Sequence, residues 1–301
     1  NMKSGAPITG SCNLFFNSIL FIIYYYIIKQ QFTILFEEIM NNHILIEKDN
    51  NILDIKFNRP ESRNAITRDM FEQILNALEK CKEDNELRAI FLSGEGDAFS
   101  AGGDVKDMAT REDNSSLQEK TNSLRRIMGV SELLYSLPIP TISIINGPAA
   151  GAGFALALAC DMRIATENAK FVTAFSKIAF SGDFGGSYFL TKIIGTAKAR
   201  ELFYLSDTID AKKAYELGII NNLIDSNEIN EYSINLKNKF RNLAPIAIKY
   251  MKKNLNIAEI GDLNLSLNQE ALHMMICSET EDHKNAAKAF VNKEKVVFKG
   301  K

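Results

Sequence analysis

The chain has 301 residues, enough for one sizeable domain with a hydrophobic core. Its 35 basic and 37 acidic side chains give a net charge of -2, which excludes the basic surface that duplex nucleic acid requires. The three histidines form no cluster, and the cysteines show no metal-ligand spacing, so we expect a reducing, cytoplasmic compartment and no metal. The four cysteines are Cys12, Cys81, Cys160 and Cys277.

Residues 1–39 differ in composition from the rest of the chain. Residues 14–28 are almost entirely apolar, but as a helix they cover only about 22 Å, less than the ~30 Å hydrocarbon core of a membrane. Lys3 is the only positive charge ahead of them, and no cleavage site follows, which disfavours a signal peptide. Three interpretations stay open: translated upstream sequence, a membrane anchor, and a packed accessory helix. We expect membrane contact only if these residues belong to the native protein.

The next stretch predicts a hairpin followed by an amphipathic helix. Apolar and polar residues alternate across residues 44–57 around a polar centre, as in two paired strands, and Arg59-Pro60 ends the pattern. Thr67 is the predicted N-cap of the helix. One face of that helix carries Met70, Ile74, Leu75 and Leu78 at helical spacing.

Two runs of small residues each follow a predicted strand and open a helix. The run 99–104 follows a strand at 89–93, and the run 146–155 follows a strand at 141–145. A helix that starts in such a run presents unpaired N–H groups and the positive end of its dipole. Two donors from two such junctions would bind one carbonyl oxygen. The alternative is that the glycines only let a helix pack closely on a sheet.

Together with three further runs, these motifs resemble the crotonase superfamily, which includes the enoyl-CoA hydratases and isomerases. The resemblance extends from about Met40 to the C-terminus, and the motifs agree with the family in order and spacing. The matching runs are residues 58–66, 98–104, 144–153, 160–165 and 211–218.

The resemblance implies an α/β fold, the crotonase (ClpP-like) spiral of repeated ββα units. We expect this core over residues 40–240, and the strand, strand, helix order of residues 140–171 agrees with it. Residues 241–301 are expected to form a C-terminal helical region that mediates a homotrimer or a dimer of trimers. Within it, residues 244–251 and 270–290 are predicted to be helical, and Lys293, Lys295 and Lys299 to add positive charge.

By motif position, the resemblance assigns the oxyanion donors and the coenzyme A site. The main-chain N–H groups of Gly103 and Ala152 would stabilise the enolate oxygen of an acyl-CoA thioester, a contribution of ~10²–10³ in rate for each donor. Coenzyme A is part of the substrate, so no separate cofactor is expected. Its pocket would be mostly main chain, and the side chains of Arg63 and Lys106 would either contact phosphate or be solvated surface charges. The predicted coenzyme A residues are Arg63, Ala65, Ala101, Gly103, Asp104, Val105, Lys106 and Ala152.

The two glutamates that hydratases of this family usually carry are replaced here by Ala155 and Phe175. Asp183 falls where other members carry a working aspartate, and its flanking text most resembles the epoxide-isomerase branch of phenylacetate degradation. We expect four nearby phenylalanines to desolvate Asp183 and raise its pKa. The alternative role for Asp183 is the N-cap of the next helix. The four phenylalanines are Phe154, Phe175, Phe180 and Phe184.

The remaining segments predict a mobile polar flap over residues 111–120 and a helix over residues 124–137. Asp104 and Asp161 are expected to be structural, as a helix cap and at a strand entrance. A dehalogenase is disfavoured because that branch also uses a tryptophan, which this chain lacks. The sequence thus predicts an acyl-CoA isomerase with Asp183 as its single acid–base group. Two alternatives remain: an atypical enoyl-CoA hydratase that uses Asp183 and a fixed water, and a non-catalytic CoA-binding scaffold.

Overall fold

The computed structural model describes residues 42–110, 112 and 114–301. The predictions for residues 1–39 lie outside these residues. The compact unit that carries all the motifs is His43–Lys301. No helix among the described residues is both long enough and apolar enough to cross a lipid bilayer.

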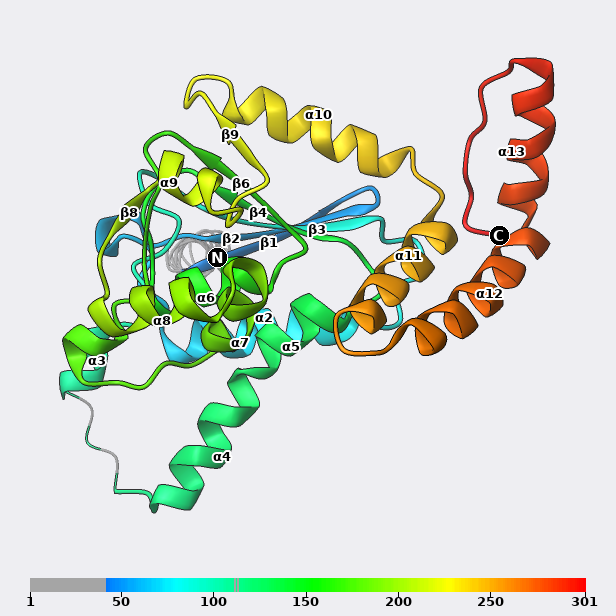
Figure 1. Cartoon of the computed structure of the whole chain (residues 1–301). Helices are drawn as coiled ribbons and strands as arrows, with labels where there is room; N and C mark the ends of the chain where they lie inside the picture. Colours follow the sequence, from blue (N-terminus) through cyan, green and yellow to red (C-terminus); the bar gives the residue numbers. More distant parts are fainter. Residues whose placement is uncertain (1–41, 111, 113) are drawn as a thin grey trace, which may run out of the picture. The chain divides into compact units, whose positions relative to one another are not determined.

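A six-stranded sheet forms the centre of the unit (Figure 1). The predicted hairpin is confirmed: its two strands pair antiparallel, with Ile44 opposite Phe57. All the other neighbours in the sheet are parallel, as expected when helices connect successive strands. In sheet order the strands are β1 (Ile44–Asp49), β2 (Ile52–Phe57), β3 (Ala89–Gly94), β4 (Thr141–Ile145), β6 (Met162–Thr166) and β9 (Asn222–Ile224).

A second, three-stranded sheet and a series of helices complete the unit. The small sheet consists of β5 (Ala149–Ala150), β7 (Lys170–Val172) and β8 (Ile209–Asp210). Two 3-10 helices are η1 (Pro60–Ser62) and η2 (Phe175–Ile178). The α-helices are α2 (Arg68–Lys80), α3 (Val105–Thr110), α4 (Leu117–Ile127), α5 (Gly129–Ser136), α6 (Gly151–Ala159), α7 (Gly186–Ile194), α8 (Thr196–Leu205), α9 (Ala211–Glu216), α10 (Ile229–Arg241), α11 (Pro245–Ala258), α12 (Leu263–Glu279) and α13 (Glu281–Asn292).

The centre of the large sheet is buried on both faces, as the alternation of side chains in β3 shows. Ile90 and Leu92 point into the main core, which contains α2, α5 and α6. Ala89 and Phe91 point to the opposite face, where α10 covers them (Figure 1). This double coverage explains why both faces of β3 carry apolar residues over Ala89–Leu92, without the polar face of a half-exposed strand.

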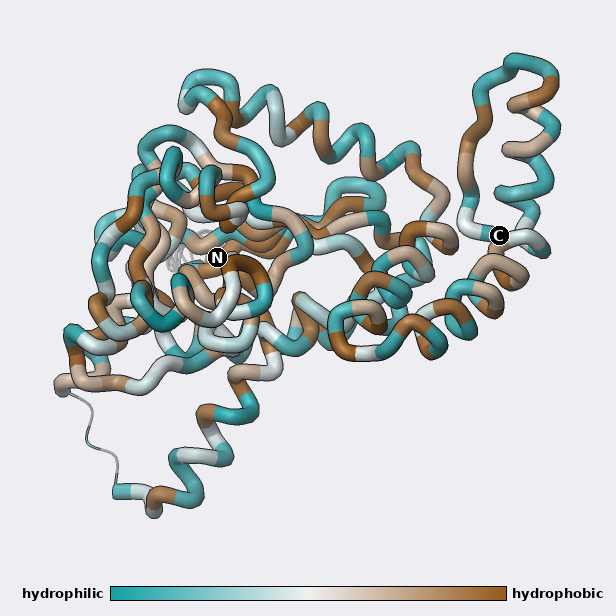
Figure 2. The backbone as a smooth tube through the Cα atoms, viewed as in Figure 1, coloured by the Kyte–Doolittle hydropathy of each residue, from teal (hydrophilic) through white to brown (hydrophobic). Residues whose placement is uncertain are grey.

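Helix α6 lies inside the main core. All nine of its residues are buried, which accounts for a sequence without a polar face (Figure 2). It begins at Gly151, as the small-residue run predicts. Helix α2 also follows the prediction, because Thr67 accepts a hydrogen bond from the Met70 amide and the four predicted apolar residues are buried.

Two predicted helices are each divided in the structure. The predicted helix over residues 124–137 is broken between α4 and α5, where Gly129 packs so closely on Leu75 that a Cβ would lie 3.2 Å from it. The predicted helix over residues 270–290 is broken at Thr280, whose backbone is extended. The Thr280 hydroxyl accepts a hydrogen bond from the His283 amide and so begins α13.

The predicted polar flap is partly helical. Residues 117–120 form the first turn of α4 rather than a loop, and Arg111 and Asp113 lie outside the described residues. Ser116 and Glu119 form a reciprocal capping box, in which the Glu119 carboxylate accepts from the Ser116 amide at 2.8 Å. This pattern of Ser followed by Glu three residues later is a helix start signal that the sequence interpretation overlooked.

Candidate active site

The amide of Gly103 lies in a loop that is fixed on both sides of it. Ile66 pairs with this loop through two hydrogen bonds, from the Ile66 amide to Gly102 O at 2.8 Å and from the Asp104 amide to Ile66 O at 3.1 Å. The pairing therefore uses the neighbours of Gly103 and leaves its own N–H outside. Among the described residues, no acceptor takes a hydrogen bond from this N–H.

The amide of Ala152 lies in the first turn of α6. Ala150 is the N-cap residue and provides no side-chain acceptor, and Gly151 adopts a positive φ of 49°. The Ala152 N–H has no acceptor within the described part of the chain, as is usual for the first turn of a helix. The helix dipole gives this end a partial positive charge.

The two junctions are in direct contact. A Cβ on Gly102 would lie 2.7 Å from Ala150 O and 3.4 Å from the Ala152 nitrogen. A Cβ on Gly153 would lie 2.6 Å from the Ser100 hydroxyl oxygen. Only glycines permit this approach, so the small residues bring the loop of Gly103 beside the start of α6. The two predicted donors are thus brought together.

Asp183 lies in a loop that packs against the same end of α6. The Phe175 ring lies between this loop and the helix. A Cβ added to Gly182 would lie 3.7 Å from one atom of the ring, and a Cβ added to Gly151 would lie 3.9 Å from another. On the other side of Asp183, a Cβ on Gly186 would lie 3.2 Å from the Ala155 Cβ. The residues around Asp183 therefore contact α6 at both Gly151 and Ala155.

The Asp183 carboxyl is held in an apolar environment. Its Oδ1 is buried and has no hydrogen-bond partner among the described residues. Burial alone raises the pKa of Asp183 to about 6. The N-cap alternative is wrong, because Gly185 is the N-cap residue of α7 and no side chain caps that helix.

The four predicted phenylalanines differ in their positions. Phe175, at 6% exposure, stacks on Phe203, with ring centroids 6.1 Å apart. Phe184 stacks on Phe71, and Phe154 packs on Phe171 at 5.4 Å. Phe180 is 55% exposed, so the expectation that it desolvates Asp183 is wrong. Its position after the left-handed residue Ala179 turns it out of the core.

The predicted coenzyme A residues form a rim around Gly103. Arg63, Ala101 and Lys106 are exposed, and the Ala101 amide donates to Arg63 O at 2.8 Å. Ala65 is half-buried, and Val105 is exposed at the start of α3. These positions leave the Arg63 and Lys106 side chains exposed beside the Gly103 loop, whereas the Ala65 and Ala101 amides already donate within the chain.

Asp104 has a structural role in this rim, as expected. Its carboxylate accepts from the amides of Lys106 and Asp107 and so caps α3. It also pairs with Arg59 at 2.9 Å, and the Arg59 hydrogen bond lowers the pKa of Asp104. The sequence interpretation overlooked Arg59, which also donates to Ala65 O at 2.7 Å. The position of Arg59 within the family-like run 58–66 could have indicated this structural role.

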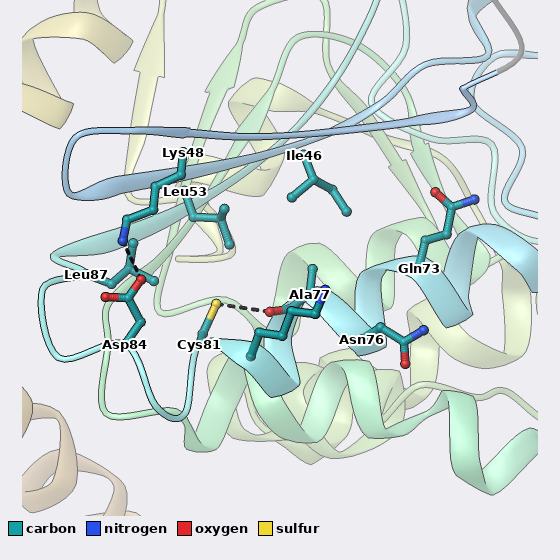
Figure 3. Close-up of a pocket in the computed structure, with 10 residues that line it drawn as sticks. Ile46, Lys48, Leu53, Gln73, Asn76, Ala77, Cys81, Asp84 and Leu87 are labelled. Carbon is teal, nitrogen blue, oxygen red and sulfur yellow. Dashed lines mark hydrogen bonds and ion pairs between the residues drawn. The ribbon is translucent and has the colours of Figure 1, made fainter. Parts of the chain in front are cut away.

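A groove between the β1–β2 hairpin and α2 is separate from these residues (Figure 3). Its volume is about 480 Å³, and none of the predicted site residues lines it. Three of its polar side chains are already bonded: Lys48 pairs with Asp84 at 2.5 Å, and the Cys81 thiol donates to Ala77 O at 3.2 Å. It therefore presents no reactive group comparable to Asp183. No group of three or more potential metal ligands occurs among the described residues.

Comparisons with known proteins identify the family of the chain. Residues 47–301 match the family model described as enoyl-CoA hydratase/isomerase. The chain is 30% identical to the short-chain-enoyl-CoA hydratase of Clostridium acetobutylicum, over 85% of this chain and 97% of the relative. It is also 30% identical to the 1,2-epoxyphenylacetyl-CoA isomerase of Escherichia coli K12, over 87% of this chain and all of the relative.

A solved structure gives the same result for the fold. The enoyl-CoA hydratase of Bacillus anthracis superposes with a TM-score of 0.80 at 28% identity, covering 86% of this chain and 100% of the other. The crotonase fold predicted from sequence is therefore confirmed. The epoxide-isomerase branch is not distinguished, because a hydratase and an isomerase show the same identity.

Proposed function

The chain belongs to the enoyl-CoA hydratase/isomerase family, and on that premise we propose that it isomerises an acyl-CoA thioester with Asp183 as its only acid–base group. The observation that carries the proposal is the Asp183 carboxyl, which is buried at Oδ1, unpartnered among the described residues and adjacent to the start of α6. A carboxyl that only stabilised the fold would be expected to accept hydrogen bonds.

The residues at the two usual glutamate positions support an isomerase over a hydratase. Ala155 and Phe175 are 1% and 6% exposed, and neither can transfer a proton. Hydration requires one group to activate water and one to protonate carbon, whereas an allylic isomerisation requires only one group that removes a proton and returns it. A single carboxylate is sufficient for the second reaction.

In the proposed mechanism, the thioester oxygen lies between the amides of Gly103 and Ala152. The Asp183 carboxylate removes a proton from the carbon next to the carbonyl, and the negative charge moves to the oxygen that the two amides stabilise. The same carboxyl then returns the proton to a carbon further along the acyl group. A pKa of about 6 favours both steps at neutral pH, since the group is ionised at rest and still basic enough to accept a proton.

Coenzyme A is proposed to bind along the exposed rim beside Gly103. Arg63 and Lys106 supply positive charge there, and the main chain at Ala65 and Ala101 would bind the adenine. Phosphate groups prefer such cationic positions. The acyl part would extend inward past Asp183.

The proposal is tested with a panel of enoyl-, dienoyl- and ring-epoxide-CoA thioesters. We expect isomerisation of at least one of them, and we expect Asp183→Asn to lower kcat by ~10³-fold or more, because the amide cannot accept the proton. Asp207→Asn serves as the matched control and should keep wild-type turnover, since Asp207 is exposed in the loop between α8 and β8. Undiminished turnover by Asp183→Asn would refute the assignment of Asp183.

A second candidate is water addition by Asp183 and a fixed water, since the chain is 30% identical both to a hydratase and to an isomerase. Product analysis in H₂¹⁸O separates the two reactions. Hydration incorporates the label into the product, whereas isomerisation leaves the oxygen count unchanged. A complete lack of turnover on the panel would favour a CoA-binding scaffold.

A further inference from the structure

We propose that the stacked pair Phe71 and Phe184 positions Asp183, by holding the loop 182–185 in a left-handed conformation. This inference rests on the proposed function. It assigns a positioning role to two phenylalanines that would touch no reacting atom.

The loop around Asp183 adopts an unfavourable conformation. Three of its four residues have positive φ: 106° at Gly182, 47° at Phe184 and 74° at Gly185. Two of these are glycines and adopt such angles freely, but a phenylalanine rarely does because its Cβ approaches the backbone. A conformation of this kind persists only where the surrounding structure enforces it.

The stack with Phe71 is the contact that enforces it. The two ring centroids are 4.3 Å apart and the planes are inclined by 17°. Both rings are buried, with 2% exposure for Phe184 and 4% for Phe71. If the backbone at Phe184 relaxed to a negative φ, the ring would leave this stack and Asp183 would move with it.

Phe71 also connects the two halves of the site. It lies in α2, which starts two residues after Ile66, and Ile66 holds the loop of Gly103 through Gly102 and Asp104. The segment 66–71 therefore contacts the loop of the predicted oxyanion donor at one end and the loop of Asp183 at the other. The stack thus sets the position of the carboxyl relative to that amide.

No charged side chain among the described residues performs this positioning instead. The elements that pack around the loop do carry charges, but none of them bonds to Oδ1 of Asp183 or shifts its pKa. These charges are Arg68, Asp69, Glu72, Glu79 and Lys80 in α2, Lys177 in η2, Lys192 in α7, and Lys198, Arg200 and Glu201 in α8, whereas α6 carries none. Burial is the only cause of the raised pKa of Asp183. The desolvation of the carboxyl is therefore set by the packing around it. A change in the packing of the two rings should alter this desolvation and with it the pKa of Asp183.

The test compares Phe71→Leu and Phe71→Tyr with the control Phe91→Leu. Phe91 is 1% exposed and packs on the opposite face of the sheet, so its replacement removes similar packing far from the loop. For Phe71→Leu we expect kcat to fall by about 10-fold or more while KM stays within about 3-fold, and we expect the acid limb of the rate profile to move from about pH 6 toward pH 4. Phe71→Tyr keeps the ring, so it should keep most of the activity and an acid limb near pH 6.

A second measurement does not depend on turnover. The Asp183 carboxyl is titrated by ¹³C NMR in the free, full-length protein, with its signal assigned by Asp183→Asn. The inference predicts a lower pKa in Phe71→Leu and an unchanged one in Phe91→Leu. It is overturned if Phe71→Leu loses thermal stability like Phe91→Leu but keeps the wild-type pKa. Failure of the proposed function gives a different result, namely full turnover by Asp183→Asn.

Discussion

Asp183 combines burial with the absence of a hydrogen-bond partner among the described residues, and both properties affect how activity depends on pH. The carboxyl must be ionised to take a proton from the substrate, and burial raises its pKa to about 6. We therefore expect kcat/KM to fall about tenfold per pH unit as the pH drops below 6. Rates measured from pH 4.5 to 9 check this. If kcat/KM fell only below about pH 4, the raised pKa of Asp183 would be contradicted.

The same carboxyl is expected to destabilise the fold at neutral pH. Its pKa is about 6 in the folded protein and 3.8 in an ordinary environment, so the folded state binds the proton more tightly. The cost of the ionised carboxyl is fully present above pH 6 and disappears as the pH falls through 3.8. Asp183→Asn should thus raise the free energy of unfolding at pH 7.5 by about 1–3 kcal/mol. Denaturant titrations at pH 7.5 and pH 4 measure the difference. A destabilised variant at pH 7.5 would show that Asp183 supports the fold instead.

At the scale of elements, a buried lysine helps attach α11 to the core. Lys252 is 6% exposed, pairs with Asp161 at 2.8 Å and donates to Leu134 O and Ile139 O at 3.0 Å. Burial lowers the pKa of Lys252 and raises that of Asp161, and the pairing opposes both shifts. Asp161 also accepts from the Thr141 amide at 2.7 Å, which confirms its expected place at a strand entrance.

We predict that Lys252→Ala lowers the free energy of unfolding by about 3 kcal/mol, since it leaves the Asp161 carboxylate and two carbonyl groups without their cation. The control is Lys253→Ala, because Lys253 is exposed on the same helix and lies near the Tyr250 ring. Its effect should stay below about 0.5 kcal/mol. Equal effects in chemical denaturation would show that the buried pair does not anchor α11.

At the scale of the molecule, the C-terminal helices expose many apolar side chains. Brown segments recur along α11 and α12 in Figure 2. Leu263 is 74% exposed, Met274 67% and Met275 61%. Apolar surface of this extent is usually covered by a partner. We therefore propose that these helices contact further copies of the chain, in a trimer or a dimer of trimers.

Met274→Lys combined with Met275→Lys is expected to shift the assembly to monomers, because it places two charges in the contact. Sedimentation velocity measures the mass, and Asp207→Lys, on an exposed loop, is the control. A wild-type protein that sediments as a monomer of 33.7 kDa would contradict the proposed assembly.

The sequence by itself determined the elements whose information is local. The hairpin, the Thr67 cap and the buried face of α2 follow from side-chain periodicity and turn chemistry, and the two small-residue runs indicated the strand-to-helix junctions. The interpretation failed where a cap interrupts an apolar pattern, as at Thr280, because periodicity alone does not show that the chain changes direction.

Only the tertiary structure decided how the site is assembled. The contact of Gly102 with Ala150, the exposure of Phe180 and the unpartnered Oδ1 of Asp183 depend on residues that are distant in the sequence. The stack of Phe71 on Phe184 joins residues 113 positions apart in the sequence. Such pairs form because burial in a common core brings separate elements together, and no local pattern records which partner each side chain meets.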